Sequence, residues 1–91
     1  MIREAGPAWD RSTPLREQEG WAAHAVFMDG LAEEGFITVG GPLGDGERTL
    51  LVVRAADEAE VKRRLAEDPW PEEMLRLALV EPWTVLLGSA P

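Results

Sequence analysis

Apolar residues recur at spacings of three and four between residues 21 and 34, which predicts an amphipathic helix. Trp21, Met28 and Leu31 form its apolar stripe, and His24, the only histidine of the chain, lies within that stripe. A buried polar ring requires a hydrogen-bond partner, because burial removes its hydrogen bonds to water and an unpaired group gains none in return. We therefore expect His24 to face the core and to contact a polar group there.

A second helix is predicted for residues 58–67, where Asp57 followed three residues later by Glu60 fits a capping box. The helix cannot continue far, since Pro69 disfavours helical geometry at the residue before it. That residue is Asp68. The sequence thus holds a carboxylate at the point where the second helix breaks.

Four segments read as strands, because they are short, apolar or alternating, and bounded by glycine and proline. They are residues 2–5, 36–39, 49–54 and 75–80, and an extended tail is expected at residues 84–87. The Asp45-Gly46 step favours a tight hairpin between the second and third strands. In the third strand both alternating faces are apolar, so we expect it to be covered on both sides.

The order strand, helix, strand, strand, helix, strand predicts an α+β, ferredoxin-like βαββαβ fold. We expect one domain over residues 1–91, with residues 88–91 as a flexible tail. The four-stranded antiparallel sheet would carry both helices on one face. Its other face requires a cover, and we expect a homodimer in which two sheets pack face to face.

Charge and composition exclude several classes of protein. Nine basic residues against seventeen acidic ones give a net charge of −8, which disfavours binding to nucleic acid or to anionic membranes. No apolar run is long enough to span a bilayer, and residues 1–4 lack the apolar core of a signal peptide, so we expect a cytoplasmic protein. With no cysteine and one histidine, we expect no metal site and no cofactor.

Glycines, prolines and aromatic residues form an ordered set around His24. The set is Gly6-Pro7-Ala8-Trp9-Asp10, Trp21-Ala22-Ala23-His24 with Phe27, Met28 and Leu31, Gly35, Gly40-Gly41-Pro42-Leu43, Asp68-Pro69-Trp70 and Pro82-Trp83. It resembles the YCII-related (YciI-like) domain family. The resemblance covers nearly the whole chain, and its most specific parts are His24, Gly-Gly-Pro and Asp-Pro-Trp at these separations.

This resemblance implies a dimeric α/β barrel with a histidine and aspartate active site. Matched residue by residue, the histidine falls on His24 and the aspartate on Asp68, while Asp45 in the hairpin is a second candidate for the carboxylate. The family also has a longer first strand than residues 1–5 provide. Either the first strand is complete but short, or the true start codon lies upstream.

Two functions fit these residues. The first is a small enzyme of the lyase or isomerase type that needs no cofactor and moves a proton on a small, cyclic or aromatic molecule. Its pocket would be shaped by Gly40, Gly41, Pro42, Trp70 and Phe27, with glycine amides near the developing charge. The alternative is a dimeric module that binds a ligand or a protein, in which the histidine and aspartate only stabilise the core.

Overall fold

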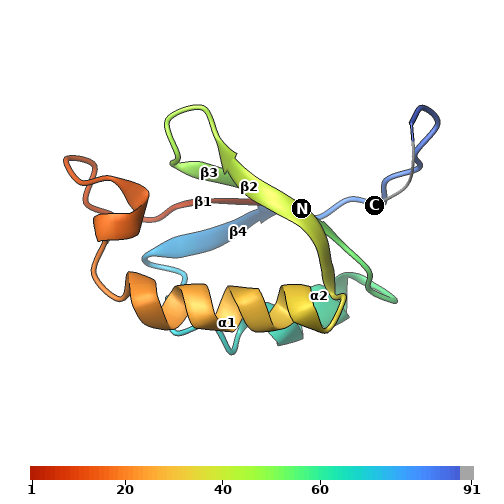
Figure 1. The fold of residues 1–91 in the computed structure, drawn as a ribbon, viewed down its shortest axis with the longest axis horizontal. Coiled ribbons are helices and arrows are strands. Elements are labelled where there is room, and N and C mark those ends of the chain that lie inside the picture. Colours follow the sequence, from red (N-terminus) through yellow and green to blue (C-terminus); the bar gives the residue numbers. More distant parts are fainter. Residues whose placement is uncertain (89–91) are drawn as a thin grey trace.

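The computed structural model describes residues 1–88 and places the strands in one antiparallel sheet of order β2-β3-β1-β4. Both helices, α1 and α2, lie on the same face of this sheet (Figure 1). The predicted ferredoxin-like α+β fold is confirmed, while the predicted tail lies outside the described residues beyond residue 88. In chain order the elements are β1 (Ile2–Ala5), the 3₁₀ helix η1 (Leu15–Glu17), α1 (Trp21–Glu33), β2 (Ile37–Leu43), β3 (Arg48–Val53), α2 (Glu58–Leu65) and β4 (Leu75–Leu79).

Strand β1 is short but lies in the middle of the sheet. Its Ile2 pairs with Leu50 of β3 and its Ala5 pairs with Leu75 of β4. The ladder extends to Met1, whose carbonyl accepts a hydrogen bond from the N–H of Leu51 at 2.9 Å. Because both sides of β1 are paired, the side chains of this strand are held in fixed positions on the two faces of the sheet.

Strand β2 is longer than predicted. The sequence pattern ended it at Val39, but the strand continues through Gly40, Gly41 and Pro42 to Leu43. That prediction was wrong because proline and glycine were read as a strand end. An edge strand tolerates proline, since only one of its sides carries ladder bonds, and β2 is the outermost strand.

The ends of the helices follow their local sequence. Helix α1 ends before Gly35, whose φ of 84° is the left-handed conformation expected after a helix. Helix α2 begins after Asp57, whose carboxylate accepts the N–H of Glu60 at 2.8 Å, as predicted for the cap. It ends at Leu65, two residues earlier than predicted, because the chain turns toward Pro69.

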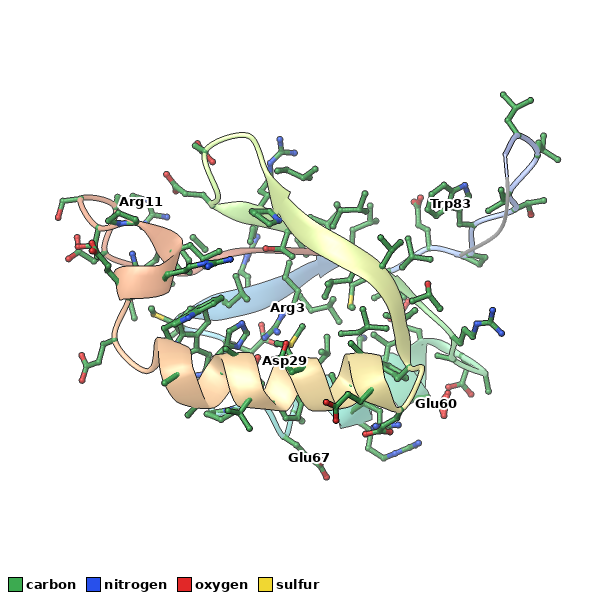
Figure 2. All side chains as sticks on the ribbon, in the orientation of Figure 1. Arg3, Arg11, Asp29, Glu60, Glu67 and Trp83 are labelled. Carbon is green, nitrogen blue, oxygen red and sulfur yellow. The ribbon has the colours of Figure 1, made fainter. Side chains whose placement is uncertain are left out.

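The C-terminal part of the chain is less regular than predicted. Strand β4 ends at Leu79, and no strand is present between residues 80 and 88. Figure 2 shows Trp83 on an arm that leaves the body of the molecule. Its side chain is 63% exposed. The extended tail predicted for residues 84–87 therefore pairs with no strand of the described chain.

Two groups of buried side chains make up the core between sheet and helices. One group contains Leu31, Phe36, Ile37, Leu51, Val61 and Leu65. The other is rich in aromatic area and contains Trp9, Trp70, Met74 and Leu75, with Trp21 packed against it. Within residues 1–88 no helix is long and apolar enough to cross a membrane.

The opposite face of the sheet carries no helix (Figure 1). Val39, Leu50 and Leu79 are 52%, 37% and 44% exposed there. Leu51 of the same strand as Leu50 is buried, because successive side chains of a strand point to opposite faces. The sheet thus has a buried side under the helices and a solvent-exposed side on which these three apolar side chains lie.

Candidate active site

Asp68 is fixed by the turn that ends α2. Its N–H donates to the carbonyl of Leu65 at 3.0 Å, and its Oδ1 accepts the N–H of Trp70 at 2.9 Å. Pro69 between them prevents the helix from continuing. The residue is buried, with 8% of its surface exposed. The break in the helix therefore places a carboxylate in the interior of the protein.

His24 of α1 meets this carboxylate. Its Nδ1 lies 2.9 Å from each oxygen of Asp68, and the residue is 6% exposed. An ionised carboxylate can only accept hydrogen bonds, so Nδ1 carries a hydrogen. In the neutral ring the lone pair is then on Nε2, which has no hydrogen-bond partner among residues 1–88. The pair thus leaves one basic nitrogen available.

Arg3 is a third member of the site that the sequence pattern did not reveal. Its Nη1 donates to Oδ2 of Asp68 at 2.8 Å, and its Nη2 donates to the carbonyl of Leu75 at 3.1 Å. The residue is 3% exposed. Figure 2 shows it between the sheet and α1. Four residues are too few to read the inward face of β1, but the central place of this strand in a ferredoxin-like sheet was a usable signal.

The ionised form of Asp68 is favoured by its neighbours. Burial alone would raise the pKa of the Asp68 carboxyl, but hydrogen bonds from His24, Arg3 and the Trp70 N–H outweigh burial and hold the pKa below its usual range. The carboxylate is therefore charged at neutral pH. It offsets the buried charge of Arg3 and fixes the hydrogen on Nδ1 of His24.

Trp70 holds the imidazole from one side. The two rings are stacked, with centroids 3.9 Å apart and planes inclined by 14°. The indole N–H of Trp70 donates to the carbonyl of Glu19 at 2.8 Å, which connects the ring to the segment before α1. Stacking and the bond to Asp68 together fix the orientation of the His24 ring.

A cavity of about 490 Å³ opens between α1 and the inner face of the sheet, and the side chain of His24 lines it. Gly40, Gly41 and Pro42 line the same cavity from β2, so the structure brings them to the side of α1 that carries His24. This volume is typical of a site for a small molecule. The other lining residues are Arg3, Leu15, Arg16, Trp21, Ala25, Met28, Asp29, Thr49, Leu51 and Leu75.

Three of the residues predicted for the site do not line the cavity. Asp45 is in the β2–β3 hairpin, where its Oδ1 accepts the N–H of Glu47 at 3.0 Å, and Asp68 is the carboxylate that contacts His24. Phe27 packs against the other group of core residues. Trp70 does not line the cavity but lies behind the imidazole. The spacing of residues along α1 did not show that Phe27 faces this core group rather than the cavity.

The arrangement defines a class of site, namely a histidine held by a buried carboxylate at the wall of a cavity. Comparisons of the chain with protein families, with curated proteins and with solved structures found no match. Residues 1–88 bring together no group of three or more histidine, aspartate or glutamate side chains that could hold a metal ion.

Proposed function

We propose that the chain is a small enzyme of the lyase or isomerase type, in which His24 moves a proton on a small organic molecule without a cofactor. The observation that carries the proposal is the cavity-lining imidazole whose Nδ1 is bonded to Asp68, since only Nε2 remains for a ligand. A base held in one tautomer and one orientation avoids the cost of ordering during the reaction.

The proposed reaction begins with a C–H bond next to a carbonyl group. Nε2 takes the proton, and the electron pair of the broken bond moves into an enolate. The protonated ring then returns its proton to another carbon, which completes an isomerisation. In an elimination, the electron pair of the enolate instead forms a C=C bond and breaks the bond to a leaving group on the neighbouring carbon, and the ring protonates that leaving group. Asp68 is a positioning residue, because it stabilises the imidazolium through Nδ1–H.

The test is proton exchange in D₂O, followed by NMR, over a panel of lactones and of hydroxylated or halogenated ring compounds. The resemblance to YCII-related proteins makes these compounds the first to screen. His24→Gln should lower the exchange rate by a factor of about 100 or more, since a positioned general base contributes that much. Equal rates for the parent and His24→Gln on every active compound would refute the proposed role.

The alternative, a non-catalytic module, is favoured by the network around Asp68. This network joins β1, α1 and the turn after α2 through Arg3 and His24, so it also has a structural value. If the pair is only structural, His24→Asn should lower the free energy of unfolding, and the parent should exchange no proton on any compound of the panel.

We also propose that the open face of the sheet binds the same face of a second copy, which would complete a dimeric barrel. Support comes from the exposed leucines and valine of that face, because small monomers rarely leave such apolar area in water. In sedimentation at micromolar concentration the parent should be a dimer and Leu50→Lys a monomer. Val26→Lys is the control, because Val26 is 72% exposed on α1. A monomeric parent would refute this proposal.

A further inference from the structure

Arg16 is a cation on the wall of the His24 cavity. It belongs to η1, the element that precedes α1, and its side chain is exposed. Among residues 1–88 it forms no ion pair. Five other arginines each pair with a carboxylate, namely Arg3, Arg11, Arg63, Arg64 and Arg76. Arg48, like Arg16, forms no ion pair within the described residues, but it does not line the cavity. An anionic group from outside the chain would complete the environment of Arg16.

A second guanidinium lies deeper in the same wall. Arg3 uses Nη1 for Asp68 and Nη2 for the carbonyl of Leu75, but its buried Nε has no hydrogen-bond partner. A buried donor without a partner is costly. The charges of Arg3 and Asp68 offset each other, so the charge of Arg16 is left to attract an anion.

Asp29 gives the cavity a direction. It also lines the cavity, but it is eight residues beyond Trp21 on α1, which corresponds to about 12 Å along the helix axis. Arg16 precedes the start of that helix. An anion is therefore attracted toward the Arg16 end and repelled from the Asp29 end. His24 lies between the two, where a reacting carbon would have to be.

The walls between these charges are mainly apolar. Trp21, Met28, Leu51 and Leu75 contribute apolar surface, and Gly40 brings no side chain into the space. An apolar body therefore fits the middle of the cavity better than a strongly polar one.

We propose that the cavity binds a small carboxylic acid, whose carboxylate pairs with Arg16 and whose ring-sized apolar body lies against Trp21 and beside His24. This inference rests on the proposed function, because it takes the His24 cavity as the substrate site. It adds the substrate class and the orientation of the substrate. A paired guanidinium and carboxylate form charge-assisted hydrogen bonds that a neutral ligand cannot replace.

Benzoate and benzamide are suitable probes, because they have the same shape and only benzoate carries a charge. Binding is followed by ¹H–¹⁵N NMR at the Gly40 and Gly41 amides and the Trp21 indole, at low ionic strength. The parent should bind benzoate about tenfold more tightly than benzamide, which corresponds to about 1.4 kcal/mol. Arg16→Gln should abolish this preference, and Asp29→Asn should increase it.

Arg63→Gln is the matched control, since it removes the same charge from the exposed surface of α2 and should keep the preference. Equal affinities of the parent for the two probes, no binding of either, or an unchanged preference in Arg16→Gln would each overturn the proposal. His24→Gln separates it from the proposed reaction. A variant that keeps the benzoate preference but exchanges no proton supports the carboxylate site and the acid–base role together, whereas a parent that prefers benzoate but never exchanges protons supports the carboxylate site alone.

Discussion

Asp68 is the residue on which the site depends, because three donors converge on it. They come from His24 of α1, Arg3 of β1 and the backbone of Trp70. A carboxylate that accepts three hydrogen bonds is held in one place, and it holds its donors in return. The stability of the fold and the orientation of the His24 ring are thus linked through one side chain.

Asp68→Asn should lower the free energy of unfolding by about 3 to 5 kcal/mol, because it leaves the buried charge of Arg3 without a partner. Urea denaturation at pH 7 measures the loss. The control is Asp45→Asn on the exposed hairpin, which should change the free energy by less than about 0.5 kcal/mol. If Asp68→Asn lowered the free energy of unfolding as little as Asp45→Asn does, the network would not be stabilising.

The same carboxylate predicts a dependence on pH. Its pKa is lower in the folded protein than in the unfolded chain, so its contribution is complete well above about pH 4 and is lost as the pH falls through the folded pKa. The difference in stability between the parent and Asp68→Asn should therefore shrink as the pH is lowered from about 6 toward 2. A difference that stays constant over this range would contradict the assignment.

At the scale of residues, the sequence predicted that His24 would contact a polar group and offered two candidate carboxylates, but it did not predict the whole network. A histidine on an apolar stripe and an aspartate before proline were both visible as local patterns. Arg3 was not, because a strand of four residues has too little alternation to show which side faces inward. Nor could spacing distinguish Asp68 from Asp45, since their distances from His24 depend on the tertiary fold.

The elements differ in how closely their glycines are packed. A Cβ added at Gly6, directly after β1, would lie 2.3 Å from the backbone oxygen of Glu73, whereas one at Gly30 in α1 would meet nothing within 4 Å. Backbone cannot move aside as a flexible side chain can. Gly6 therefore joins the end of β1 to the turn before β4 at a distance that only glycine permits.

Gly6→Ala should lower the unfolding free energy by more than about 1 kcal/mol, because the chain must shift to remove the clash. Gly30→Ala is the matched control and should raise it by about 0.5 to 1 kcal/mol through helix propensity. Thermal unfolding of both variants beside the parent measures the two effects. The packing at Gly6 would be less tight than described if Gly6→Ala were as stable as the parent.

Element order and type were predictable, because they follow from periodicity over many residues. The ends were less so. β2 runs through a glycine pair and a proline because its position at the sheet edge relaxes the demand for backbone donors. β4 stops at Leu79 although the alternation continues to Val80, since no neighbouring strand extends that far. Edge position and pairing partners are tertiary facts that no local pattern contains.

The whole molecule carries a net charge of −8 in 91 residues, so its surface charges repel one another on average. Added salt screens this repulsion. It also weakens the exposed ion pairs, but each of these is worth less than about 1 kcal/mol. At pH 7 the melting temperature should rise between about 10 and 150 mM NaCl. The rise should be smaller near pH 4, where many carboxylates are protonated. A fall in the melting temperature with added salt at pH 7 would show that the exposed ion pairs outweigh the repulsion between like charges.

The central position of β1 has a consequence for biosynthesis. Both neighbours of this strand, β3 and β4, are synthesised after it, and β4 ends at Leu79. A chain still attached to the ribosome therefore cannot close its sheet until residue 79 has emerged. Arg3 of β1 contacts both Asp68 and the carbonyl of Leu75 in β4. We therefore expect the sheet and the histidine site to form in the same event.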